Sequence, residues 1–174
     1  MAITIIVEDG SIVPNANSLL SLIDARALAE SLGVELPTLD DDAITALIQG
    51  GIYVNNQEGG LQGARVSIDQ TMCFPRSGVV KYGFDVPNDS IPSDVICAQV
   101  EAASQIGAGV NPYANDTGKE VKLQEVVGSV KREFFESGKT DANVSLTTAD
   151  NCLFPLTLLA IGVSGGFNFS VSRG

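Results

Sequence analysis

The chain has 174 residues, 44% of them hydrophobic, which suits one globular domain with a core that needs no metal or disulfide. Its 21 acidic and 10 basic residues give a net charge of −11, which argues against nucleic acid or an anionic membrane as the main partner. Three distant cysteines and no histidine argue against a zinc site and a Cys/His catalytic pair, so we expect reduced, buried thiols, no metal and no cofactor.

The N-terminal segment, MAITIIVEDG, is expected to form a short strand or an extended arm over residues 3–7. It lacks a basic start, and its apolar run ends at Glu8 and Asp9, so we expect no signal peptide. The most apolar segment, residues 152–163, contains a proline and is shorter than the roughly 20 residues of a membrane helix. We therefore expect a soluble protein, synthesised in a reducing cytoplasm.

Apolar residues recur at helical spacing in three segments, which predicts three helices. In the first, Ser21 and Asp24 resemble a capping box, and Gly33 stands where a helix would end. In the third, a proline occupies the first turn, where its missing N–H costs nothing. The predicted helices cover about residues 21–32, 40–55 and 92–106.

The second predicted helix has two further features. Three aspartates, residues 40–42, suit the positive end of a helix dipole better than a cation site, because no further ligand spacing follows them. Gly50 and Gly51 weaken a helix, which indicates close packing against another backbone at that point.

The stretch TMCFPRSGVV, residues 71–80, resembles a site but has no catalytic group beside it. Pro75 holds the preceding residue extended, Phe74 supplies a large side chain to bury, and Gly78 permits a turn. Arg76 then lies on a rigid corner, where its planar guanidinium group can pair with a carboxylate or with backbone carbonyls. We favour a structural corner over a ligand site. The sequence leaves open whether Arg76 pairs within one subunit or between subunits.

The hydrophobic period changes from 3.6 to 2 within residues 119–136, and its phase shifts near Gly128. This predicts two strand segments joined by a bend, with Val126 and Gly128 as structural or interface candidates. The stretch NVSLTT, residues 143–148, is a candidate for a further strand.

The C-terminal residues 151–174 consist of a short apolar segment and an alternating aromatic and polar tail. An alternating segment without a hairpin partner of its own either docks on a neighbouring chain or frays. Phe167, Phe169 and Arg173 are its interface candidates. The fold class we predict is mainly α with a small β element (α+β): a single domain over 1–150, with three to four helices and a β-hairpin-like segment, followed by this extended tail.

No catalytic motif fits the chain. A phosphate-binding loop, a GxGxxG fingerprint, a GxSxG elbow and an HExxH helix are all missing from the sequence. Without histidine, a serine nucleophile lacks its usual base. We therefore predict no catalytic residues and no enzymatic activity.

Six stretches follow one another in an order that is itself informative. They are VEDGS, NANS, ALIQGGIYVN, CFPRSGV, IPSDVICAQVEAA and EVVGSVKREF, spread over residues 3–136. In this order they resemble a family of tailed-bacteriophage proteins labelled DnaT-like single-stranded-DNA-binding, whose members resemble head-to-tail connectors, also called adaptors or head-completion proteins. The chain departs from that family at Leu19, where an aromatic is usual, and at Phe74, where tryptophan is usual. Residues 137–174 match least.

The resemblance implies a structural virion protein of the neck, made in the bacterial host cytoplasm. Many copies, typically about twelve, would form a ring beneath the portal, join the capsid to the downstream neck or tail protein, and surround the double-stranded DNA that leaves the capsid. An acidic wall repels phosphates, so the net charge of −11 suits a channel better than a clamp.

The alternative function is that of the family label, a single-stranded nucleic-acid-binding accessory protein. Half of the basic residues fall in one strip, residues 119–139, which could contact phosphates. This basic strip contains Lys119, Lys122, Lys131, Arg132 and Lys139.

Overall fold

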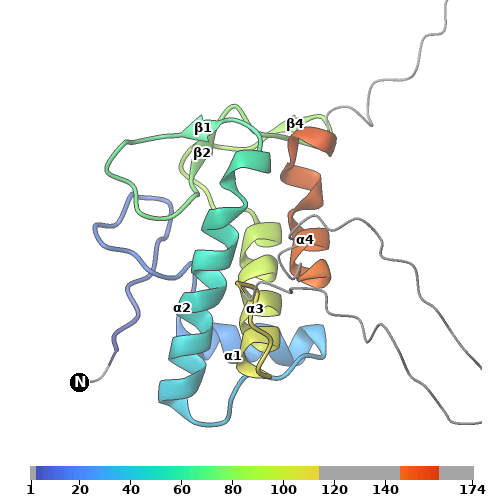
Figure 1. The fold of residues 1–174 in the computed structure, drawn as a ribbon. Coiled ribbons are helices and arrows are strands. Elements are labelled where there is room, and N and C mark those ends of the chain that lie inside the picture. Colours follow the sequence, from blue (N-terminus) through green and yellow to red (C-terminus); the bar gives the residue numbers. More distant parts are fainter. Residues whose placement is uncertain (1–2, 114–145, 161–174) are drawn as a thin grey trace, which may run out of the picture. The chain divides into compact units, whose positions relative to one another are not determined.

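A computed structural model of the chain describes residues 3–113 and 146–160, and its helices all belong to one unit built from parts of residues 1–110 and 146–174. The fold is α+β, as predicted, with a helical bundle and small antiparallel strand pairs (Figure 1). The described helices are α1 (Leu22–Leu32), α2 (Asp40–Asn56), α3 (Ser93–Gly107) and α4 (Thr147–Leu153), with 3-10 turns η1 (Glu58–Gly60) and η2 (Phe154–Leu156).

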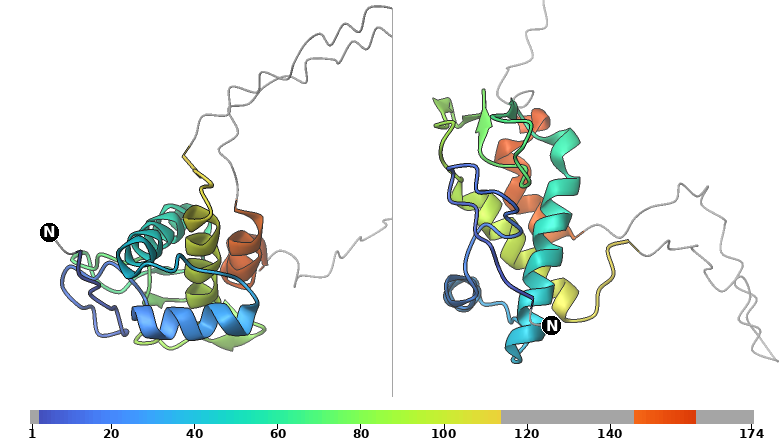
Figure 2. Two further views of the ribbon diagram at one scale, coloured as in Figure 1. Left: turned by 90° about the horizontal axis from the view of Figure 1, so that it is seen from below. Right: turned by 90° about the vertical axis from the view of Figure 1, so that its left-hand side faces the viewer.

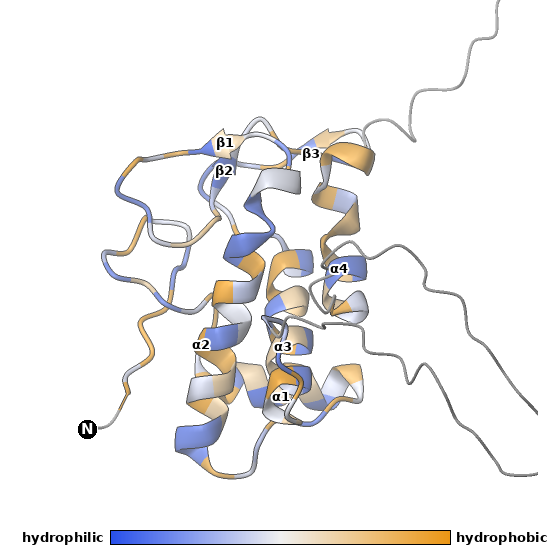
Figure 3. Ribbon diagram, viewed as in Figure 1, coloured by the Kyte–Doolittle hydropathy of each residue, from blue (hydrophilic) through white to orange (hydrophobic). Residues whose placement is uncertain are grey.

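The helices pack in chain order around a core of small and aliphatic side chains. Helix α3 lies between α2 and α4, and α1 crosses one end of this layer, as the two views of Figure 2 show. The helices carry both hydrophobic and hydrophilic residues (Figure 3), as amphipathic helices at a surface do. The three predicted helices are thus confirmed within one or two residues at each end.

Helix α1 begins and ends as the sequence predicts. The Ser21 side chain accepts a hydrogen bond from the backbone N–H of Asp24, and Gly33 ends the helix with a left-handed φ of 73°. The buried face of α1, however, consists of Ala25 and Ala29. Ile23, an apolar residue in the first turn of the same helix, is 81% exposed.

The double glycine of α2 lies close to other backbone, as predicted: Gly50 faces α3, and Gly51 faces the carbonyl of Asn17. A Cβ atom on Gly50 would come within 2.5 Å of the carbonyl oxygen of Gln99, so the helices can approach this closely only without a side chain there. Gln99 is fully buried; its side chain donates to the Leu47 carbonyl and to Ser18 Oγ, and accepts from the Leu19 N–H, each at 2.9 Å. This amide therefore fixes the N-terminal segment to both central helices.

The N-terminal residues form an extended arm, as expected, with a parallel bridge between Val7 and Ser18. The next turn closes around Glu8, which is 1% exposed. Its carboxylate accepts hydrogen bonds from the N–H groups of Gly10, Ile12 and Val13, each at 2.9 Å. Three backbone donors satisfy the buried carboxylate, which explains how a charged residue fits beneath this loop.

The strands lie at positions that the sequence did not predict. Two-residue strands form the pairs β1 (Ala64–Arg65) with β2 (Arg76–Ser77), and β3 (Val80–Lys81) with β4 (Phe84–Asp85). The strands that we predicted over 119–136 fall outside the described residues.

Two further expectations are wrong. Thr147 and Thr148, which we placed in a strand, begin helix α4 instead. Cys97 of α3 and Cys152 of α4 are joined as a disulfide, with Cα atoms 6.1 Å apart, whereas we expected reduced thiols; Cys73 is free and buried. Among the described residues, no helix is long and apolar enough to cross a membrane.

Candidate functional site at the hairpin end

The C-terminal end of α2 carries η1, both strand pairs and η2, and we call this region the hairpin end (Figure 1). An ion-pair cluster of Glu58, Arg65 and Arg76 holds its segments together. Arg65 Nη2 and Arg76 Nη1 lie 2.7 Å from the two carboxylate oxygens of Glu58. Hydrogen bonds from Arg65, and then from Arg76, hold the pKa of Glu58 below its usual value.

Arg76 is the buried member of this cluster, at 4% exposure. Besides Glu58, its guanidinium donates to the carbonyls of Gln62 and Gly63 at 2.7 Å, and to that of Cys73 at 3.3 Å. All these acceptors belong to its own chain. The structure therefore decides between the alternatives that the sequence left open: Arg76 pairs within the subunit.

The rest of the corner is also built into the interior. Phe74 is fully buried, and the Phe74–Pro75 peptide is cis. Gln70 donates to the carbonyls of Met72 and Pro75 at 2.8 Å, which fixes both sides of the bend. Gly78 ends it with a φ of 75°, a conformation that favours glycine.

Gln62 connects the two strand pairs to η2. Its side chain, 1% exposed, accepts from the N–H of Val80 at 2.9 Å and donates to the carbonyl of Thr157 at 3.0 Å. Its backbone N–H donates to the Leu156 carbonyl at 2.9 Å. Segments distant in sequence thus form one rigid platform.

This platform presents two aromatic side chains to solvent. Tyr82 and Phe84, on the β3–β4 hairpin, are each 77% exposed. Tyr82 and Gly83 both have positive φ, 53° and 87°, as the central residues of a type I′ turn require. A bulky residue rarely adopts this conformation, where asparagine or glycine is favoured. Since Tyr82 contributes little to the core, the folding of the turn does not explain a tyrosine there.

The base of the hairpin is anchored by charge. Lys81 forms an ion pair with Asp94 in the first turn of α3, and its ammonium lies 5.3 Å from the centre of the Tyr82 ring. The cation thus contacts the ring and is neutralised by the carboxylate of Asp94. The hairpin presents apolar rings on a rigid base, a typical composition for a protein contact.

Positive charge in the described part of the chain is fully paired. It contains four basic residues against 15 acidic ones. Each of the four forms an ion pair with a carboxylate, so these cations hold the fold together rather than forming a phosphate-binding surface. The pairs are Arg26 with Asp40, Arg65 and Arg76 with Glu58, and Lys81 with Asp94.

The candidate residues from the sequence fall into two groups. Phe74, Pro75, Arg76 and Gly78 meet at the hairpin end, where the first three are buried and Gly78 lies exposed at the turn. The others, Val126, Gly128, Phe167, Phe169 and Arg173, lie outside the described residues.

Sequence reasoning missed Glu58, Gln62, Tyr82 and Phe84. The one local signal was the glycine of KYGFD, which marks a tight turn between two exposed aromatics. Within the described ranges, no group of three or more Cys, Asp or Glu side chains is placed to hold a metal ion.

Comparison with protein families relates the chain to a family. The sequence model of a family described as "Putative DnaT-like ssDNA binding protein" matches residues 3–174. No curated protein and no solved structure matches the chain.

Proposed function

The chain belongs to the DnaT-like ssDNA-binding family, and within that family we propose that it is a structural virion protein, a head-to-tail connector that forms a ring beneath the portal. In this proposal it joins the capsid to the downstream neck or tail protein and surrounds the DNA exit channel. It acts through the shape of its assembly and makes or breaks no bonds.

The observation that carries this proposal is that the surface has no unpaired positive charge among the described residues but exposes aromatic side chains. All four cations of the described residues are neutralised by carboxylates, and the surplus charge is negative. A surface of this kind gains little from counterion release on phosphates, but it can line a channel through which DNA passes without sticking. The exposed rings of Tyr82 and Phe84, in contrast, favour a contact with protein.

Electron microscopy of the purified full-length chain, alone and mixed with portal protein, tests the proposal. We expect rings of about twelve copies, or rings that join the portal. A chain that stays monomeric and never binds portal would contradict it.

A double variant, Tyr82→Ser with Phe84→Ser, tests the hairpin in the same experiment. We expect a loss of ring formation or portal binding of at least about tenfold, because exposed aromatic anchors dominate such contacts. Ile68→Ser is the matched control, since Ile68 is 96% exposed in the loop between β1 and β2 and should leave assembly unchanged. Equal assembly of all three proteins would exclude the hairpin as an interface.

The second candidate function is single-stranded nucleic-acid binding, which the family description favours. Because the four described cations are paired, a binder would depend on the basic strip of residues 119–139. Fluorescence titration of an oligonucleotide at two salt concentrations separates the functions, since binding to phosphates weakens steeply with salt. Salt-sensitive binding that disappears in Lys131→Glu with Arg132→Glu, but persists in Arg26→Glu, would favour this second function over the connector.

A further inference from the structure

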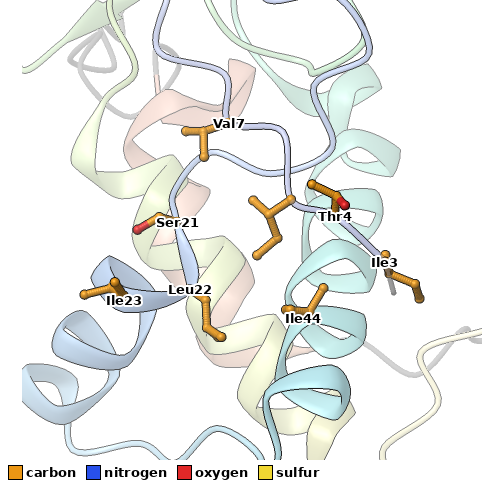
Figure 4. A pocket seen from close by; sticks show the side chains of 8 residues that line it. Ile3, Thr4, Val7, Ser21, Leu22, Ile23 and Ile44 are labelled. Carbon is orange, nitrogen blue, oxygen red and sulfur yellow. The ribbon is translucent and has the colours of Figure 1, made fainter. Parts of the chain in front are cut away.

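An apolar groove of about 360 Å³ lies between the N-terminal arm and the first turns of α1 and α2 (Figure 4). No charged side chain lines it, and Thr4 and Ser21 are its polar members. A lining of this kind does not fit a phosphate or another charged ligand and favours an apolar occupant. The apolar lining residues are Ile3, Ile5, Val7, Leu22, Ile23 and Ile44.

The groove exposes large apolar side chains that the core does not use. Ile23 is 81% exposed and Ile3 is 52% exposed, although both are strongly hydrophobic. Figure 3 shows the arm as an orange, hydrophobic segment along the edge of the unit. Contiguous apolar side chains at a surface indicate an interaction site.

The backbone of the arm offers an open strand edge beside the groove. On one side, Ile6 donates to Asn17 Oδ1 at 2.8 Å and its carbonyl accepts from the Asn17 N–H at 2.9 Å, while the Glu8 N–H donates to the Ser18 carbonyl at 2.8 Å. Ile5 and Val7 alternate with these residues, so their backbone groups face the opposite edge. Within the described residues, their N–H and carbonyl groups make no hydrogen bond. Such an edge is a template for an added strand.

The C-terminal tail of the chain has the sequence pattern of such a strand. Phe167, Phe169 and Val171 alternate with asparagine and serine, which gives an extended segment one apolar and one polar face. Paired with the arm, this segment would direct its apolar side chains to the groove and satisfy the open backbone groups of Ile5 and Val7. Its single charge, on Arg173, lies beyond the apolar positions.

The length of the C-terminal tail favours docking on a second copy over docking on its own chain. Thr157 pairs with Leu61, so the described chain ends near the C-terminal end of α2, whereas Ile44 of the groove lies near its N-terminal end. Along α2, Ile44 and Asn56 are separated by about 18 Å. The seven residue-to-residue steps from Ala160 to Phe167 span at most about 25 Å when fully extended. A subunit's own tail would have to run largely extended to cover this distance, and a neighbouring subunit's tail has no such restriction.

We propose that residues 167–171 of one copy dock as an added strand on the arm of a second copy, with their apolar side chains in the groove. This inference rests on the proposed function in one respect, that the protein acts as an assembly of identical copies. It assigns to the arm and the tail the role of linking neighbours.

Site-specific crosslinking in the full-length chain tests the contact directly. Phe167 is replaced by the photoreactive amino acid p-benzoylphenylalanine, and the protein is mixed with an isotopically labelled copy so that crosslinks between subunits differ in mass. We expect intermolecular crosslinks to residues 3–7 or 21–23. In the Ile23→Asp background they should fall at least tenfold, and in Ile68→Asp they should be unchanged. Both positions are exposed, at 81% and 96%, so neither substitution should unfold the protein.

The outcomes distinguish the two proposals. Absence of crosslinks, crosslinks confined to one chain, or crosslinks to other segments would overturn the docking of the tail, even if electron microscopy shows rings. Crosslinks at the groove in a protein that forms only dimers and never joins portal would support the docking and overturn the connector function.

Discussion

Arg76 Nη1 donates to Glu58 Oε1 at 2.7 Å, and this bond connects the corner after the cis Phe74–Pro75 peptide to the turn that follows α2. The Arg76 side chain is 5% exposed and the Glu58 side chain 30% exposed, so the pair lies at the boundary of the core. Because the same guanidinium bonds the carbonyls of Gln62 and Gly63, the position of both strand pairs depends on it.

Replacing Arg76 by lysine should therefore destabilise the protein strongly. Lysine keeps the charge but cannot reach the Glu58 carboxylate and two carbonyls at once, since its three donors share one nitrogen. We expect a loss of about 3 kcal/mol in the free energy of unfolding, measured by urea denaturation. Arg26→Lys, which alters the exposed pair with Asp40, is the control and should change it by less than about 0.5 kcal/mol. Equal effects of both substitutions would contradict the central role of Arg76.

Glu58 should make stability depend on pH in the acid range. Hydrogen bonds from Arg65 and Arg76 lower its pKa in the folded protein below the usual value of a glutamate side chain. As the pH falls, the unfolded chain therefore binds a proton before the folded protein does. The contribution of Glu58 to the free energy of unfolding is fully present above about pH 5 and is lost as the pH falls through the pKa of the folded protein. The free energy of unfolding should fall more steeply from pH 5 to pH 3 in the natural protein than in Glu58→Gln. Parallel curves for both proteins would exclude this contribution.

The helices were predictable because their signals are local. Ser21 and Asp24 cap α1 from within one turn. The segments of α2 and α3 are long enough for their apolar residues to show a helical period. Gly50 indicated a close backbone contact by its type alone, although only the structure identifies Gln99 as the partner. Helix α4 was missed because it is short and begins with two β-branched threonines, whose strand propensity is overridden by packing against α3.

The candidate site was less predictable, because its bonds join distant residues. Glu58 and Arg76 are 18 positions apart, and Gln62 bonds a carbonyl 95 positions away, so no local pattern relates them. A strand of two residues is too short to show alternating hydrophobicity, so the sequence pattern does not indicate either strand pair. The exposed Tyr82 could be suspected only from the neighbouring Gly83.

Adding a methyl group to Gly50 should separate α2 from α3. The new Cβ would lie 2.5 Å from the Gln99 carbonyl oxygen and 3.0 Å from the Ala103 nitrogen, and backbone atoms cannot move aside as a flexible side chain would. We expect Gly50→Ala to lower the free energy of unfolding by about 2–3 kcal/mol in urea denaturation, despite the better helix propensity of alanine.

Gly59→Ala is the matched control for this substitution. A Cβ at Gly59 meets nothing within 4 Å, so its effect should stay within about 0.5 kcal/mol. A neutral or stabilising effect of Gly50→Ala would contradict the close contact between the two helices.

The three cysteines should react differently with a thiol reagent. Cys97 and Cys152 are joined as a disulfide, and burial raises the pKa of Cys73 to about 12, so that at pH 8 this thiol is neutral and shielded. A thiol assay without reductant should detect almost no thiol in the folded protein and one per chain after unfolding in denaturant. Reduction before unfolding should raise that number to three. Three thiols per unfolded chain without reductant would restore the expectation from the sequence that all three cysteines are reduced.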